Sequence, residues 1–170
     1  MADQQQLDLL RQGVEAWNTW RKEYPNKVVD LTGANLSQAK LHVPYLSGIN
    51  LSRAFLSGAY LSGVFLNGAN LQGADLSGVN LSRAHLIMAD LTKANLSLAF
   101  LLRANFRGAK LVGTDLSVAD LSMADFRGAD LSEANLSRAN LSGAKLTGAT
   151  LSGTHLHEVR FVPMDPERRY

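Results

Sequence analysis

Residues 71–90 read LQGADLSGVNLSRAHLIMAD, and a Leu stands at every fifth position of this stretch. The same spacing continues without an insertion from Leu31 to Phe161, which gives twenty-seven centres, twenty-four of them Leu and three Phe. The residue two before each centre is Ala nineteen times and is otherwise Val, Thr, Ile or Pro. Most of the chain is therefore one five-residue unit repeated, and a repeat of this kind fixes an architecture.

A five-residue period matches neither the 3.6 residues per turn of a helix nor the two-residue period of a strand. In an extended segment, residues two apart share a face, so Ala34 and Leu36 point inward while Asn35 and Ser37 point outward. Gly occupies thirteen of the twenty-seven positions two after a centre, where the chain has to bend. Each unit is therefore predicted to be one short side and one corner, wound into a coil with the Leu centres at its axis.

Two of these units, Ala74–Gly78 (ADLSG) and Ala134–Arg138 (ANLSR), resemble the A-[DN]-L-x-x signature of the pentapeptide repeat family. The resemblance covers residues 29–163. It implies an all-β solenoid, a right-handed quadrilateral β-helix of about seven coils and roughly 32 Å long, with four units per coil. Residues 105–109 (NFRGA) return twenty positions later as DFRGA, which fits that coil and predicts that Phe106 and Phe126 stack.

Residues 1–28 lack the repeat and are predicted to form a short amphipathic helix that ends before Pro25. The apolar residues at helical spacing are Leu7, Leu10, Val14 and Trp17. A solenoid exposes an apolar cross-section at its first coil, so we expect Leu10, Val14 and Trp17 to cap that end. The alternative is that Trp17 and Trp20 recruit a partner. The segment 13–21 also resembles the leader of cyanobacterial members of the family.

The 170 residues, with 46% hydrophobic residues, 19% charged residues and a formal net charge of +2, fit a single soluble body. We divide it into a helical cap at 1–28, a solenoid at 29–163 and a tail at 164–170. The absence of Cys excludes disulfides and thiolate metal sites. Neither a secretory signal nor a membrane-spanning stretch is present, so we expect a cytoplasmic protein with no membrane partner. The tail either covers the last coil or leaves it free to form a homodimer.

The inward centres are predicted to be structural, and partner binding is expected at outward positions that depart from small polar residues. The structural core includes Leu76, Leu96, Phe106, Leu116, Phe126 and Leu136. A first outward apolar cluster comprises Phe55, Tyr60 and Phe65, and a second comprises Leu98, Phe100, Leu102, Val118 and Met123. Contiguous exposed apolar surface marks contact sites. The alternative for the first cluster is that the N-terminal helix covers it or that its rings stack as ladders.

No catalytic constellation interrupts the repeat, so the sequence predicts a protein that is not an enzyme and needs no cofactor. His155, His157 and Glu158 lie together on a convex wall, which disfavours a metal site there. We predict a non-enzymatic protein–protein interaction scaffold or regulatory protein that binds another protein.

The alternative, implied by the family resemblance, is a DNA mimic that inhibits or protects a type II topoisomerase such as gyrase. Mimicry needs a strongly negative surface, whereas residues 29–163 carry eleven Lys and Arg against nine Asp and Glu. If the coil has four sides, one side carries Lys40, Arg83, Arg103 and Arg160 against Asp120. That scattered basic stripe suits an acidic partner better than a nucleic acid, which normally binds denser basic clusters.

Overall fold

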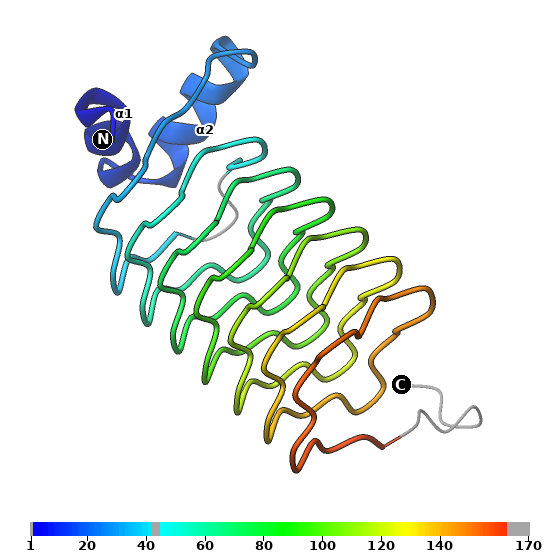
Figure 1. The fold of residues 1–170 in the computed structure, drawn as a ribbon. Coiled ribbons are helices and arrows are strands. Elements are labelled where there is room, and N and C mark those ends of the chain that lie inside the picture. The colour runs from blue at the N-terminus through cyan, green and yellow to red at the C-terminus, as the bar shows by residue number, and fades with distance from the viewer. Residues whose placement is uncertain (1, 42–44, 163–170) are drawn as a thin grey trace, which may run out of the picture.

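The computed structural model describes residues 2–41 and 45–162, which form a four-sided β-solenoid with two helices at its N-terminal end (Figure 1). Every fifth residue from Asp30 to Asn140 pairs in parallel with the residue twenty positions farther along. The predicted all-β solenoid with a coil of four units is therefore confirmed. Because each side is so short, these pairs are isolated bridges and no extended strand forms among the described residues.

The backbone around the residue before each centre links its coil to both neighbours. The Asn50 N–H donates to the Val29 carbonyl (3.0 Å) and the Asn50 carbonyl accepts from the Leu31 N–H (2.8 Å), both in the preceding coil, and the Ile49 carbonyl accepts from the Asn70 N–H (2.9 Å) in the following coil. Each corner is closed by a turn, as where the Ala34 N–H donates to the carbonyl of Leu31 (3.0 Å). The backbone of a unit is thus held by the coils on each side as well as by its own turn.

The Asp or Asn before a centre accepts a hydrogen bond from a backbone N–H that the ladder between coils does not pair. Asp75 Oδ1 accepts from the Ser77 N–H (3.1 Å), and Asn95 Oδ1 accepts from the Ser97 N–H (3.0 Å). These contacts are Asx turns, in which a short polar side chain bonds the backbone two residues on. They give the repeat a physical reason to place Asp or Asn at this position.

The corner residue two after each centre has a left-handed backbone. Gly78 has φ 61°, but the angle is imposed on other residues as well, including Val118 at 59° and Arg138 at 61°. All twelve non-Gly residues with positive φ in the described part of the chain occupy this position. Left-handed backbone costs an L-residue about 1–2 kcal/mol. The sequence predicted Gly-rich bends, and the structure shows that the bend remains the same where Gly is missing.

The inward residues form one continuous core along the rod. The side chains of Leu76, Leu96, Leu116 and Leu136 are completely buried. The rings of Phe106 and Phe126 are also buried and stack with their centroids 4.9 Å apart and their planes 2° apart. Each centre therefore packs against the centres of the coils before and after it, and core burial is shared between neighbouring coils.

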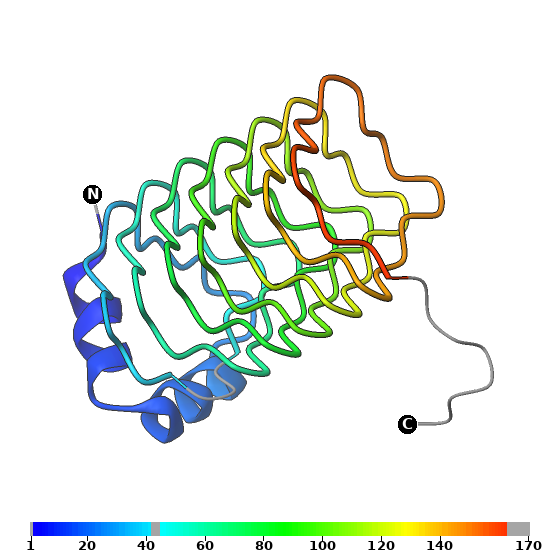
Figure 2. The ribbon, with the colours of Figure 1, turned by 90° about the horizontal axis from the view of Figure 1, so that it is seen from below.

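Two helices lie across the first coil, α1 (Gln4–Arg11) and α2 (Val14–Glu23), where the sequence predicted one (Figure 2). The helical conformation is interrupted at Gly13, whose φ of 124° is not helical. Leu10 and Trp17 are buried, and Val14 is partly buried against the core. Pro44 and the tail at 164–170 lie outside the described residues.

The cap supplies hydrogen bonds that a preceding coil would make on two sides of the first coil. They run from the Asp3 N–H to the Asp30 carbonyl (2.7 Å), from the Asp30 N–H to Gln6 Oε1 (3.0 Å), from the Tyr45 N–H to Asn18 Oδ1 (2.9 Å) and from Trp17 Nε1–H to the Tyr45 carbonyl (3.0 Å). Gln6 also donates through Nε2 to the carbonyl of Val28 (3.0 Å). Side chains of the helices thus form hydrogen bonds with an open β-edge, which would otherwise present unpaired donors and acceptors.

Truncation of a central Leu should destabilise the solenoid far more than truncation of an end Leu. Leu96→Ala removes a fully buried side chain between two coils, so we expect a loss of about 2–5 kcal/mol in the free energy of unfolding. Leu156→Ala is the matched control at a protein concentration at which the protein is monomeric, because Leu156 occupies the same wall of the last coil and is 51% exposed. Denaturant titration measures both changes. Equal losses would contradict the axial core described above.

Removal of the Gln6 amide should weaken the cap. Gln6→Ala leaves the Asp30 N–H and the Val28 carbonyl without their side-chain partner, which should cost about 1–3 kcal/mol. Gln5→Ala is the control, because the neighbouring Gln5 side chain is exposed. Amide hydrogen exchange at Asp30 should accelerate in the Gln6 variant alone. Unchanged exchange there would show that the cap bond contributes nothing to protecting this edge.

Candidate functional site

One wall of the solenoid and the corner that leads into it carry the exposed apolar residues Leu98, Phe100 and Val118, and we call this wall the Phe100 face. Its outward column, one residue per coil, runs Lys40, Tyr60, Asn80, Phe100, Asp120, Asn140 and Arg160. The corner that leads into this face, which we call the Leu98 corner, carries Gln38, Gly58, Gly78, Leu98, Val118, Arg138 and Glu158. The register of twenty residues places these side chains in two adjacent columns along the rod.

The second apolar cluster predicted from the sequence is brought together on this face. Leu98, Phe100 and Leu102 belong to one coil and are 59%, 56% and 37% exposed. Val118 is the next residue along the Leu98 corner and is also exposed. Met123 is half-buried, with its sulfur 3.4 Å from Nε of Arg103. The result is an apolar row across the face, extended by one coil toward the C-terminus.

Two hollows follow the Leu98 corner on either side of this row. A notch of about 260 Å³ has Gly58, Gly78 and Asn80 in its lining, and Tyr60 and Phe100 stand two coils apart on either side of Asn80. A second hollow, of about 410 Å³, is lined by polar and charged residues together with Val118 and Ala119. The notch stays open at the Gly78 corner, where an added Cβ would meet no other atom within 4 Å, whereas the Gln38 side chain lies over the Gly58 corner and lines the notch there.

The first apolar cluster predicted from the sequence does not form a single patch. Phe65 is half-buried in a stack, with its ring centroid 5.4 Å from that of Tyr45 and 4.8 Å from that of His85. Tyr60 is 47% exposed and belongs to the Phe100 face. Phe55 is also exposed, but it lies on the preceding wall. The ladder alternative thus describes Phe65, whereas the N-terminal helices do not bury Phe55 or Tyr60.

The apolar row is energetically unfavourable for the solenoid alone. Leu98 and Val118 have φ of 60° and 59°, and left-handed backbone is especially rare for a β-branched residue such as Val. Phe100 also takes the place of an Asx residue, and the Leu102 N–H has no acceptor among the described residues. One coil later, Asp120 Oδ1 accepts from the Ser122 N–H (3.1 Å). Strained and exposed apolar residues that collect at one place are typical of functional sites.

The charges around the Phe100 face are mainly basic. Within the described residues, no ion pair joins a carboxylate to the side chains of Lys40, Arg83, Arg103 or Arg160. Arg138 and Glu158 form an exposed pair at 3.5 Å, and Asp120 is the other acidic residue of the face. This wall thus carries more positive charge than the chain as a whole.

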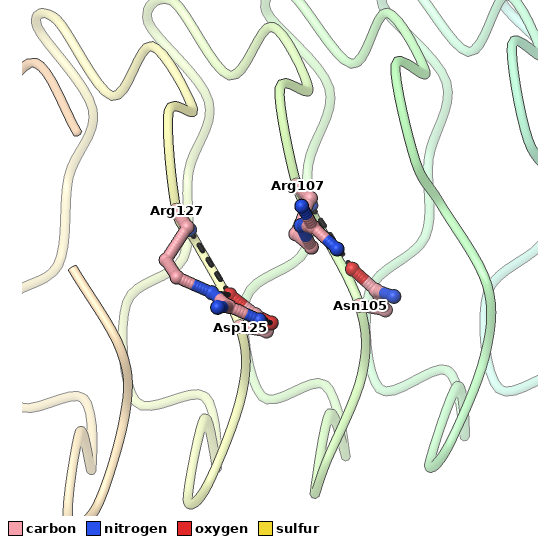
Figure 3. A network of polar contacts seen from close by, with 4 residues as sticks. All are labelled: Asn105, Arg107, Asp125 and Arg127. Carbon is pink, nitrogen blue, oxygen red and sulfur yellow. Dashed lines mark hydrogen bonds and ion pairs between the residues drawn. The ribbon is translucent and has the colours of Figure 1, made fainter. Parts of the chain in front are cut away.

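The next wall carries an isolated ion pair (Figure 3). Arg127 donates from Nη2 to Asp125 Oδ2 (2.6 Å) and from Nε to Oδ1 (2.9 Å). The Arg127 hydrogen bond holds the pKa of Asp125 below its ordinary value, against a smaller opposing effect of burial. One coil earlier the pair is replaced by Asn105 and Arg107, where Asn105 accepts only the backbone N–H of Arg107 (3.2 Å). This wall therefore resembles a structural ladder more than a binding site.

The part of the chain that the structure describes holds no group of three or more His, Cys, Asp or Glu side chains suited to a metal ion. His157 Nε2 lies 3.2 Å from Glu158 Oε1, and both side chains are largely exposed. Neither of the described helices, α1 or α2, is long and apolar enough to cross a membrane. The features of the described surface that can contact another molecule are apolar side chains, arginines and a notch.

A four-sided β-solenoid whose walls repeat one five-residue unit and whose first coil is capped by helices defines a class of repeat protein. The family model described as pentapeptide repeats matches eight copies, within residues 45–83, 84–122, 100–138 and 124–161. The chain therefore belongs to the pentapeptide repeat family, whose members fold into right-handed quadrilateral β-helices. No curated protein matches the chain.

Solved structures of the same class are similar to this chain. QnrB1, a plasmid-mediated fluoroquinolone resistance protein, superposes with a TM-score of 0.55 at 22% identity, over 75% of this chain and 77% of QnrB1. This likeness shows a shared fold. The pentapeptide repeat protein alr5209 from Nostoc Pcc 7120 is 40% identical over 51% of this chain and 84% of its own, with a TM-score of 0.45. Rfr23 from the cyanobacterium Cyanothece 51142 is 24% identical over 85% of this chain and 97% of its own, with a TM-score of 0.43.

The ion pair on the wall of Figure 3 should make a small, acid-sensitive contribution to stability. The pKa of Asp125 is lowered in the folded protein, so its stabilising effect is present above the unfolded-state pKa and is lost as the pH falls through the folded-state pKa. Arg127→Ala should therefore lower the thermal midpoint slightly at neutral pH and leave it unchanged in strong acid. Arg107→Ala is the control, since Asn105 does not titrate. A pH-independent difference for Arg127→Ala would contradict this account.

Proposed function

We propose that this protein is a non-enzymatic scaffold with a regulatory role that binds another protein through the Phe100 face. The observation that carries the proposal is that two energetically unfavourable features occur in the same coil. Leu98 combines a left-handed backbone with 59% exposure, and Phe100 combines a missing Asx turn with 56% exposure. A partner that buries both side chains would offset this unfavourable free energy, because burial stabilises by about 1.5–3 kcal/mol for each fully buried side chain.

The architecture supports this use. A solenoid held by hydrogen bonds between all successive coils presents a rigid wall, so a partner loses little free energy to ordering the scaffold. The described surface offers an apolar row with a notch beside it, and such anchors surrounded by polar residues are typical of protein contacts.

Mimicry of DNA toward a type II topoisomerase is disfavoured as the function. The fold likeness to QnrB1 leaves that role open, because a fold hosts several functions. The Phe100 face, however, carries four basic side chains without an ion pair among the described residues. A surface that imitates a DNA duplex needs a dense negative field, and this wall has the opposite sign.

We further propose that the C-terminal coil mediates a homodimer. The described part of that coil leaves Leu151, Leu156 and Phe161 between 39% and 52% exposed. The N–H groups of Leu146 and Leu156 have no acceptor among the described residues. A second copy placed end to end would cover both the apolar cross-section and this edge.

Restoration of the repeat pattern on the Phe100 face should abolish partner binding without weakening the fold. Leu98→Gly removes the left-handed strain, and Phe100→Asn supplies an acceptor for the Leu102 N–H. We therefore expect the double variant to be at least as stable as the parent, by up to about 1–2 kcal/mol, and to lose the captured partner. The measurements are thermal unfolding and affinity capture from cells that express the protein naturally.

Met88→Gly is the matched control for this experiment. Met88 has φ 58°, is 68% exposed and lies on the opposite corner of the solenoid, two corners away from Leu98. The control should gain a similar stability and keep the partner. Retention of every partner by the Leu98→Gly, Phe100→Asn variant would exclude the Phe100 face as the binding surface.

Charges placed on the last coil should prevent dimerisation. Leu156→Glu and Phe161→Glu put carboxylates at the exposed cross-section, so the particle mass measured by light scattering should fall from dimer to monomer. Ser137→Glu, on the outer wall one coil earlier, serves as the control and should remain dimeric. A parent protein that is monomeric at high concentration would refute the homodimer.

A further inference from the structure

We propose that the partner segment bound by the Phe100 face is an acidic amphipathic α-helix that lies along the Leu98 corner, parallel to the axis of the solenoid. The inference rests on the proposed function and goes further, because it names the kind of segment that fits. Three properties of the face lead to it: the state of its backbone hydrogen bonds, the spacing of its coils and its charge.

The backbone groups of the outward column at Asn80 and Phe100 are already paired, so the Leu102 N–H is an isolated donor and the face offers no continuous edge to an extended peptide. The Asn80 N–H donates to the Ala59 carbonyl (2.9 Å), and the Phe100 N–H donates to the Val79 carbonyl (2.8 Å). The Phe100 carbonyl in turn accepts from the Leu81 N–H (2.8 Å). A strand added to this wall would bury backbone groups without partners, which is unfavourable. A helix satisfies its own backbone and can bind through side chains alone.

The spacing of the coils matches a helix better than a strand. Tyr60 and Phe100 are two coils apart, which is about 9.6 Å at strand spacing. Helix residues i and i+7 are about 10.5 Å apart, and one helical turn rises about 5.4 Å. Side chains on one face of a strand recur at about 6.8 Å and lose register with the coils after one step. A helix stays in register with this wall over two or three turns.

This register assigns a place to each apolar residue of the helix. One apolar side chain enters the notch of about 260 Å³ at Asn80, between Tyr60 and Phe100. The residues three and four positions later then lie over Leu98 and Phe100, and the residue seven positions later lies over Val118. The pattern i, i+3 or i+4, and i+7 is the apolar stripe of an amphipathic helix.

The charge of the wall specifies an acidic helix. Arg83 and Arg103 stand on the corner at the far side of the apolar row and are exposed, and Lys40 and Arg160 lie at the two ends of the outward column. Carboxylates that flank the apolar stripe of the helix would face these bases, whereas lysines would be repelled. An anionic membrane shares the charge complementarity but not the fit to a recessed notch, so it is an outcome of the test.

A peptide display selection tests the proposal. Random peptides of about 18 residues, or five helical turns, are selected on the full-length protein after depletion on the Leu98→Gly, Phe100→Asn variant. The expected binders carry apolar residues at i, i+3 or i+4, and i+7 with Glu or Asp beside them, and they become helical on binding. Replacement of the acids of a selected peptide by Lys should weaken binding by about tenfold or more at low salt.

Charge reversal on the protein provides the matched comparison. Arg83→Glu with Arg103→Glu should weaken the acidic peptides by about tenfold or more and favour their Lys analogues. Arg53→Glu with Lys93→Glu is the control, because both residues are exposed and occupy the same repeat position on another corner. The control should leave binding unchanged. Equal losses in both variants would overturn the placement of the helix.

The other outcomes separate this inference from the proposed function. Binders that depend on Leu98 and Phe100 but are basic, extended or rich in Pro would overturn the acidic helix and leave the protein-binding face intact. Selection of no binder that depends on these residues would overturn both. If vesicles with anionic headgroups bind the parent but not the Leu98→Gly, Phe100→Asn variant, the occupant of the face is a membrane surface and the acidic helix is excluded.

Discussion

The ladder of backbone hydrogen bonds between coils twenty residues apart is the constraint on which the rest of this structure depends. It fixes which residues face the axis, because inward and outward positions alternate along each short side. A slip of one residue would expose Leu96 and bury Asn95. The ladder also imposes a left-handed corner once per unit, whatever residue stands there, as at Val118. Core, corners and outer columns all follow from one register.

A ladder of this kind needs an end, and the two ends of the rod differ. At the N-terminus, Gln6 and Asn18 use side-chain amides to imitate the backbone of a coil that is not there. At the C-terminus, the described residues leave Leu156 and Phe161 exposed. The edge of the first coil is thus closed within the chain, and the exposed side chains of the last described coil are the reason why we propose the homodimer there.

Much of the fold was predictable because the repeat is regular, so local pattern and global structure agree. The interval of twenty residues between Phe106 and Phe126 predicted their stack, and the spacing of Leu10 and Trp17 predicted the cap. Two helices in place of one were missed, because Gly13 reads equally well as a tolerated helix residue. The role of Gln6 was missed because nothing in a run of three glutamines distinguishes the one that meets the β-edge.

The sequence by itself determined the coil, its apolar core and the columns in which outward side chains stand, because a strict five-residue period leaves one way to bury every Leu. It therefore also placed Leu98, Phe100 and Val118 near one another. The tertiary structure alone decided that Phe65 is held in a ring stack, that Leu98 is strained and that the Gly78 corner leaves a notch open beside Phe100. These properties arise from backbone angles and from space between neighbouring coils, which no single stretch of sequence contains.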